Sequence, residues 1–75
     1  MEKRCMSLMK INEEGRVRRI NDSSDMRRRF VDIGIFEGAR VRKIGTSPLG
    51  DPSAYMVSGV LVAIRDREAA RIELE

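Results

Sequence analysis

The sequence predicts a small, mainly β domain, an antiparallel barrel of about five strands with one short α-helix. Three observations predict it. The chain has 75 residues, a length that forms one domain with a modest core. Its apolar residues fall in short runs separated by glycines and prolines at turn positions, as in compact β domains. One segment, between Asn21 and Gly34, has the apolar spacing of a helix.

The N-terminal part is expected to contain a flexible leader, residues 1–7, followed by the folded domain, residues 8–75. Leu8 and Ile11 are the first spaced apolar residues of that domain. We expect both side chains to pack beneath the barrel, in a short strand or turn.

The first strand is expected at residues 15–20. Its apolar residues, Val17 and Ile20, are three positions apart, so strict alternation would place them on opposite faces. We therefore expect a bulge or a strong twist in this strand. The run at 16–20 is repeated at 40–44, with arginine and lysine between the apolar positions, and we interpret the two runs as edge strands with basic outer faces.

The helix is delimited by residues at both ends. Residues 21–24 offer several N-cap candidates. The apolar residues recur at i, i+4 and i+7, the spacing of one helical face: Met26, Phe30 and Ile33. Gly34 is predicted to end the helix in the left-handed conformation, with Ile35 packing against Phe30 in a Schellman cap.

Further strands are expected at residues 39–47, 53–57, 60–64 and 72–74, with one helical turn at most between 65 and 70. Pro48 and Pro52 bracket a turn, and Ser58 with Gly59 forms a hairpin. At this length, the strand count favours an SH3-like barrel. Its core is predicted to include ten residues: Val17, Ile20, Phe30, Ile33, Val41, Ile44, Val57, Leu61, Ala63 and Ile72.

The sequence has neither the pattern of a membrane span nor that of a signal peptide, which indicates a cytoplasmic protein. No run approaches the roughly 20 apolar residues of a membrane span, and the N-terminus lacks the apolar stretch of a signal peptide. The net charge of +3 is uneven, because residues 1–45 carry 12 basic and 7 acidic side chains and residues 46–75 carry 3 and 5. Such polarity can steer an acidic partner, a nucleic acid or an anionic membrane surface, or it can be a solvated surface that is rich in arginine.

The sequence argues against an enzyme. It contains no histidine, its single cysteine, Cys5, falls in the expected leader, and no phosphate-binding loop is present. Asp51, Asp66 and Glu68 are interpreted as solvated turn residues. We therefore expect no catalytic residue, no cofactor and no metal site.

The chain resembles the FeoA family, ferrous iron transport protein A, across residues 8–74. Four features carry the resemblance: Gly15 and the segments 29–38, 48–52 and 61–72. The Pro-Leu-Gly-Asp-Pro sequence at 48–52 is the most specific of them. Glu37 departs from the family, which usually has proline at that position.

The resemblance implies an SH3-like fold and a small, non-catalytic, cytosolic accessory protein of bacterial ferrous iron uptake. It implies that the partner is FeoB, a membrane transporter with a cytosolic GTPase domain, which the protein binds and modulates. It implies neither specific nucleic-acid binding nor insertion into the membrane.

We predict that the partner-binding surface joins the helix to the turn at 48–52, because two prolines and a glycine hold that turn rigidly and lower the entropy cost of binding. Leu49 is apolar in a polar turn, so it either folds back onto the core or is offered to a partner, and we favour the partner. Arg27 and Tyr55 are expected to supply the charged and aromatic rim. The predicted site residues are Arg27, Pro48, Leu49, Gly50, Asp51, Pro52 and Tyr55.

Two alternatives remain open. The arginines at 27–29 and the basic strand at 38–45 would suit an SH3-like nucleic-acid-binding module. The scarcity of aromatic residues argues against base stacking, so such binding would be weak and salt-sensitive. The other alternative is a free-standing, peptide-binding SH3-like domain similar to the tail domain of iron-dependent repressors.

Overall fold

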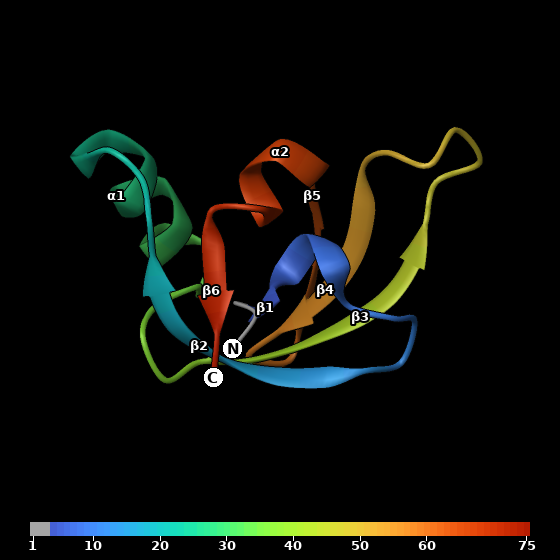
Figure 1. The fold of residues 1–75 in the computed structure, drawn as a ribbon, viewed down its shortest axis with the longest axis horizontal. Coiled ribbons are helices and arrows are strands. Elements are labelled where there is room, and N and C mark those ends of the chain that lie inside the picture. Colours follow the sequence, from blue (N-terminus) through green and yellow to red (C-terminus); the bar gives the residue numbers. More distant parts are fainter. Residues whose placement is uncertain (1–3) are drawn as a thin grey trace.

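The computed structural model describes residues 4–75. In this part of the chain, antiparallel strands form one sheet in the order β1-β6-β2-β3-β4-β5 (Figure 1). The strands are β1 (Arg4–Cys5), β2 (Glu14–Ile20), β3 (Arg40–Thr46), β4 (Ser53–Val57), β5 (Val60–Ile64) and β6 (Ile72–Leu74). The helical segments are η1 (Met6–Leu8), α1 (Ser24–Asp32) and α2 (Asp66–Ala69).

The mainly β prediction with one principal helix is confirmed, with one added strand, the short β1. The four residues of α2 are the single helical turn expected between residues 65 and 70. The described strands β1 and β5 are the two ends of the sheet, so the sheet is strongly bent but does not close. None of the described helices is long and apolar enough to cross a membrane.

β2 connects the two halves of the sheet, because it pairs with β6 on one side and with β3 on the other. Its register with β6 shifts between Val17 and Arg19. This irregularity confirms the expected bulge and allows Val17 and Ile20 to be buried together. β3 lies between β2 and β4, so the two basic strands are inner neighbours and the prediction that they are edge strands was wrong.

Both ends of α1 follow the sequence signals. Ser23 is the N-cap, and its Oγ accepts a hydrogen bond of 3.4 Å from a backbone N–H in the first turn. At the other end, Gly34 has a φ of 96°. The N–H of Ile35 donates to the carbonyl of Phe30 (2.8 Å), and that of Gly34 donates to Val31 (3.0 Å). These two bonds are those of a Schellman cap.

β4 and β5 form the predicted hairpin with the predicted bounds. Ser58 and Gly59 both have positive φ angles, 50° and 84°, as a type I′ turn requires. The turn pairs Val57 with Val60, which fixes the register of the whole hairpin.

One apolar core lies inside the bent sheet. Its buried members are Met6, Met9, Val17, Ile20, Phe30, Ile35, Ala39, Val41, Tyr55, Val57, Ile64, Ala69, Ile72 and Leu74. The predicted core residues that it confirms are Val17, Ile20, Phe30, Val41, Val57 and Ile72.

Four predicted core residues are exposed: Ile33, Ile44, Leu61 and Ala63. Ile33 is the C-cap of α1, where the helical face ends. Ile44 lies where the β3–β4 register shifts, between Lys43 and Gly45. Leu61 and Ala63 point outward because Val62 and Ile64 share the face of Tyr55 and Ser53, their partners on β4.

The N-terminal segment is part of the fold. Met6 and Met9 are buried in the core, whereas Leu8 and Ile11 are exposed. The prediction that Leu8 and Ile11 pack beneath the barrel was therefore wrong, because η1 turns Met6 inward and Met9, its C-cap, is buried as well. Arg4 and Cys5 pair with β6, so residues 4–7 do not form a leader; residues 1–3 of the expected leader lie outside the described residues.

Candidate functional site

The turn at 47–52 is held by its own backbone. The N–H of Gly50 donates to the carbonyl of Ser47 (2.8 Å), and the N–H of Ser47 donates to the carbonyl of Pro52 (3.1 Å). Gly50 has a φ of 88°, and the Asp51–Pro52 peptide bond is cis. The turn therefore has a defined backbone course from one strand to the next.

Asp51 fastens this turn to α2. Its Oδ1 accepts a hydrogen bond of 2.8 Å from the backbone N–H of Asp66, the first residue of the helix. The N-cap residue itself, Arg65, provides no side-chain cap. Asp51 thus satisfies a helix-terminal donor from a distant segment, and its primary contact is within the molecule.

Leu49 projects from the same turn. Its side chain is 93% exposed, so of the two alternatives considered for it, folding back onto the core does not occur. Leaving a leucine in water forgoes about 1.5–3 kcal/mol that its burial would supply. An apolar side chain on a restrained turn is suited to contact with another molecule.

Tyr55 does not belong to the surface. It is fully buried, and its hydroxyl donates a hydrogen bond of 3.1 Å to the carbonyl of Met6. Burial, together with the negative charge of Asp66, raises the pKa of Tyr55 to about 12. The predicted role of Tyr55 as the aromatic rim of a contact was therefore wrong. Strand alternation with Val57, two positions away, was the signal that could have placed it inside.

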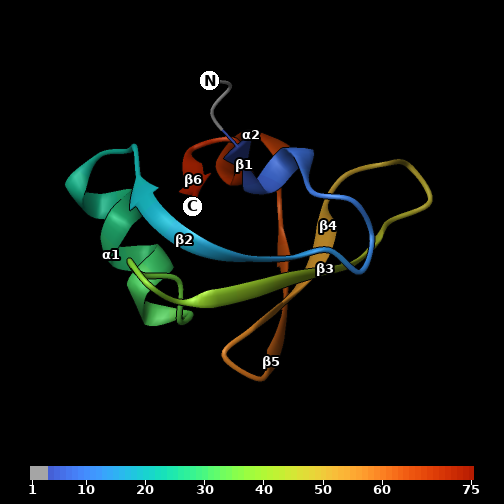
Figure 2. The same ribbon diagram turned by 60° about the horizontal axis from the view of Figure 1, so that its bottom comes forward.

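Arg27 is exposed on α1, at the opposite end of the molecule from the turn (Figures 1 and 2). The helix and the turn consequently do not form one continuous surface. Of the predicted site residues, the structure brings together the five of the turn at 48–52 and separates Arg27 and Tyr55 from them.

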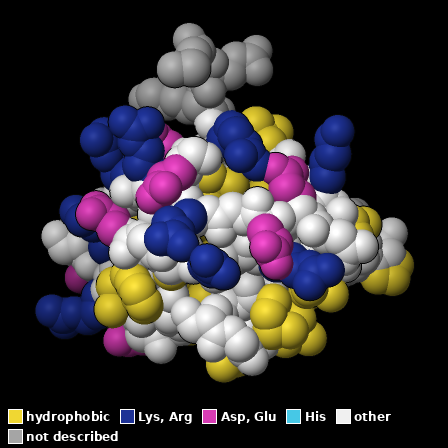
Figure 3. Space-filling view, turned by 90° about the horizontal axis from the view of Figure 1, so that it is seen from below, with side chains coloured by type: hydrophobic (Ala, Val, Ile, Leu, Met, Phe, Trp, Pro, Cys, Tyr) yellow, Lys and Arg dark blue, Asp and Glu magenta, His cyan; other side chains and the backbone are white. Residues whose placement is uncertain are grey.

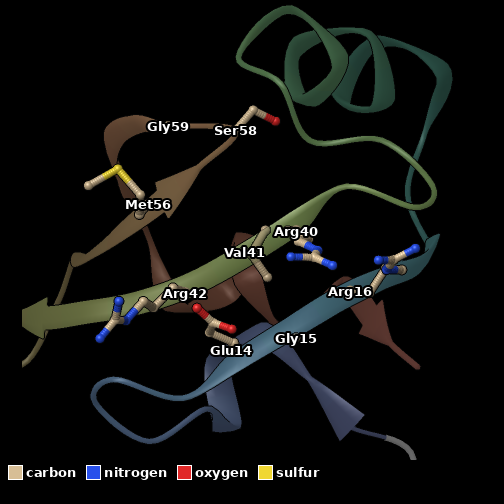
Figure 4. Close-up of a pocket in the computed structure, with 9 residues that line it drawn as sticks. All are labelled: Glu14, Gly15, Arg16, Arg40, Val41, Arg42, Met56, Ser58 and Gly59. Carbon is tan, nitrogen blue, oxygen red and sulfur yellow. The ribbon is translucent and has the colours of Figure 1, made fainter.

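A second candidate lies on the outer face of β2 and β3, the strands at the bottom of Figure 1. A groove of about 450 Å³ runs between these strands and the tip of the β4–β5 hairpin (Figure 4). Arg16 of β2 lies directly opposite Arg40 of β3, and Glu14 lies opposite Arg42. Seen from below, basic and acidic side chains gather across the middle of the molecule (Figure 3).

Sequence reasoning did not place this groove. It recognised that residues 16–20 and 40–44 repeat, but it assigned them to separate sheet edges. Antiparallel pairing of the two repeats was the missing signal, because it brings their first arginines face to face.

Within residues 4–75, no three histidine, cysteine, aspartate or glutamate side chains converge. Cys5 is partly buried and lies 3.1 Å from the Ser7 hydroxyl. The described residues therefore offer surfaces for contact and no preformed metal centre.

Comparison with known proteins gives one family and several related folds. The model of the FeoA domain matches residues 4–75. The solution structure of the FeoA protein from Chlorobium tepidum is 29% identical, with a TM-score of 0.89 over 96% of this chain and 69% of that one. No curated protein sequence matches significantly.

Two further structures extend the likeness. Stenotrophomonas maltophilia FeoA complexed with zinc, described as an SH3 domain protein, is 24% identical, with a TM-score of 0.82 over 96% of this chain and 89% of that one. A manganese-dependent transcriptional repressor complex with manganese is 25% identical, with a TM-score of 0.86 over 97% of this chain and 36% of that one. These likenesses confirm the small SH3-like fold.

Proposed function

Since the chain belongs to the FeoA domain family, we propose that it is a non-catalytic, cytoplasmic accessory protein of ferrous iron uptake. In this proposal it binds the cytosolic domain of a FeoB-like membrane transporter and modulates the GTPase of that domain. Family membership supports the link to ferrous iron transport. The partner and the effect on the GTPase are the parts to be tested.

Leu49 is the observation that carries the proposal. It is the most exposed of the large apolar side chains in the described residues, at 93%, and its turn is closed by two backbone hydrogen bonds. A restrained turn loses little conformational entropy on binding. A few residues buried at the centre of a contact can supply most of its binding energy.

Leu49 is also the residue to change, because Asp51 is committed to α2 and its substitution would disturb the fold. The test uses the purified GTPase-bearing cytosolic domain of the ferrous iron transporter from the same organism, titrated calorimetrically. We expect Leu49→Asp to raise the Kd by about tenfold or more, which is at least about 1.4 kcal/mol. The wild-type chain should bind at micromolar concentration.

Leu8→Asp is the matched control. It makes the same change on another exposed leucine, 72% exposed, in η1. Its Kd should stay within about twofold of the wild-type value, since surface changes away from a contact have small effects. If the wild type does not bind, or if both variants bind equally well, the turn is not the contact surface.

The modulation is measured separately, as the rate of GTP hydrolysis by the same domain with saturating wild-type protein and with Leu49→Asp. A changed rate that returns to baseline with the variant supports the proposal. Binding with an unchanged rate would leave an accessory protein that does not act on the GTPase.

A second candidate function is peptide binding by a free-standing SH3-like domain. The likeness to the manganese-dependent repressor, in which this chain covers 36% of the other protein, supports the free-standing part of this alternative. Failure to bind the transporter domain, together with binding to a short peptide, would favour this second function over the first.

A further inference from the structure

Three arginines on the outer face of β2 and β3 form no ion pair with any residue of the described part, 4–75. Ion pairs among the described residues engage Arg4, Arg18 and Arg29, and none engages Arg16, Arg40 or Arg42. All three are exposed.

Arg16 and Arg40 oppose each other directly across two strands. Like charges in this position destabilise a sheet. A guanidinium pair at such a position is suited to an anion that both side chains can share, because the planar fork of arginine matches a carboxylate.

The spacing of the two arginines along β3 indicates how a bound peptide would lie. Arg40 and Arg42 are two residues apart, so they point to the same face about 7 Å from each other. Side chains at i and i+2 of an extended peptide have the same separation. An extended segment lying along β3 with acidic residues at alternate positions would therefore meet both arginines.

The rest of the groove suits a peptide. Figure 4 shows Arg16 and Arg40 together at one end, with Arg42 and Glu14 at the other. Met56 and the Ser58–Gly59 turn form the opposite wall, and Val41 lies between the basic side chains. Glu14 repels a carboxylate near Arg42, so the Arg16–Arg40 end is the stronger anchor. No aromatic side chain lines the groove, which disfavours the base stacking used for single-stranded nucleic acid.

We propose that this groove binds an extended acidic segment of a partner protein, whose carboxylates pair with Arg16, Arg40 and Arg42. The site is separate from the turn that carries Leu49, and the inference does not depend on the identity of the transporter.

The test follows backbone amide shifts of the labelled protein by NMR at low ionic strength. The probe is an end-blocked octapeptide of alternating glutamate and alanine, which carries four carboxylates. We expect saturable shifts concentrated in β2, β3 and the Ser58–Gly59 turn. The same peptide with glutamine in place of glutamate should give no such shifts, because its charge is gone.

Two double variants distinguish specific binding in the groove from non-specific electrostatic attraction to a basic protein. Arg16→Gln with Arg40→Gln should raise the Kd for the acidic peptide by about tenfold or more. Arg27→Gln with Arg28→Gln removes the same charge from α1 and should change the Kd by less than about twofold. The dispersion of the amide spectrum verifies that each variant is folded.

Several results would overturn the inference. They are an absence of shifts at millimolar peptide, shifts spread over the whole basic surface, and equal weakening in the two double variants. The last comparison replaces the peptide with a thymidine pentanucleotide, which carries four phosphates. Tighter binding of that oligonucleotide than of the peptide in the same groove would assign the site to nucleic acid instead.

Discussion

Tyr55 connects the N-terminal segment to the sheet through one hydrogen bond, from its hydroxyl to the carbonyl of Met6 (3.1 Å). Both residues are fully buried. Since a buried polar group needs a partner, this bond explains how a phenol is accommodated in an otherwise apolar core. It also makes the residue a reporter of folding.

The first prediction concerns the titration of Tyr55. Burial raises its pKa to about 12, from 10.0. The neutral phenol therefore stabilises the folded state, in full below about pH 10, and this contribution is lost as the pH rises toward 12. Tyr55 is the only tyrosine and there is no tryptophan, so tyrosinate absorbance reports on it alone.

We expect the absorbance midpoint near pH 12 in the folded protein and near pH 10 in denaturant. Tyr55→Phe is the matched control, because it keeps the ring and removes the ionisable group. The loss of stability between pH 10 and 12 should be smaller in that variant. A folded-state midpoint near pH 10 would contradict the burial of this side chain.

The second prediction concerns Arg16 and Arg40. Replacing Arg16 with glutamate converts a like-charge pair into an opposite-charge pair, so the free energy of unfolding should rise by about 0.2–1 kcal/mol. Urea unfolding measures the change. Arg27→Glu changes the net charge equally on the exposed side of α1, and we expect a smaller gain there. Equal gains would mean that only the overall charge matters.

At the level of elements, the stability of α1 depends on the residues that cap its two ends. Nine residues are too few for a helix to be stable alone in water. The Ser23 cap and the Schellman bonds satisfy terminal groups, and Phe30 anchors the helix to the core.

The third prediction is that Gly34→Ala destabilises the protein by about 1–2 kcal/mol, because a side chain is strained at a φ of 96°. The added Cβ would also lie 3.4 Å from the Val57 Cγ1. Gly45→Ala is the control, since that glycine has no positive φ and its Cβ would meet nothing within 4 Å. The stability of the Gly45→Ala protein should be unchanged or slightly higher than that of the wild type. Urea unfolding measures the stability of both variants. Equal losses in Gly34→Ala and Gly45→Ala would show that the helix cap at Gly34 does not explain the destabilisation.

Local signals predicted these elements well. The N-cap, the terminating glycine and the two-residue hairpin turn act through neighbouring residues, and all three were predicted correctly. The faces of β5 were predicted wrongly, although the hairpin register decides them: Tyr55 pairs with Val62 and Val57 with Val60. Treating each strand separately, without its partner, produced the error in Leu61 and Ala63.

At the level of the whole molecule, the candidate sites depend on contacts between distant segments. Leu49 could be predicted because turn chemistry at 48–52 is local. Arg16 and Arg40 lie opposite each other only because β2 pairs with β3, and the two residues are more than twenty positions apart in the sequence. The sequence also could not show that α1 and the 48–52 turn lie at opposite ends (Figure 1). Sequence analysis therefore proposed the turn as a candidate surface, joined it wrongly to α1, and did not find the groove on β2 and β3.

A single core joins all the described elements except β1, and the fourth prediction tests whether they unfold together. Phe30, 3% exposed, belongs to a cluster that includes η1, β2, β3, β4, β5, α2 and β6. Phe30→Ala should cost about 3–5 kcal/mol. A domain of this size has roughly 4–11 kcal/mol in total, so the midpoint of thermal unfolding should fall by about 12 °C or more.

Phe36→Ala makes the same change at the other phenylalanine, which is 46% exposed. Less apolar area is lost there, so we expect a cost below about 1 kcal/mol. Circular dichroism follows the helix and sheet signals, and amide exchange follows each element in both variants. With one shared core, Phe30→Ala should lower the protection of every element together, including β1 and β6, which are distant from α1 in the sequence. Loss confined to α1, or equal costs for the two phenylalanines, would show that the helix is an independent unit and that the core does not make this small domain cooperative.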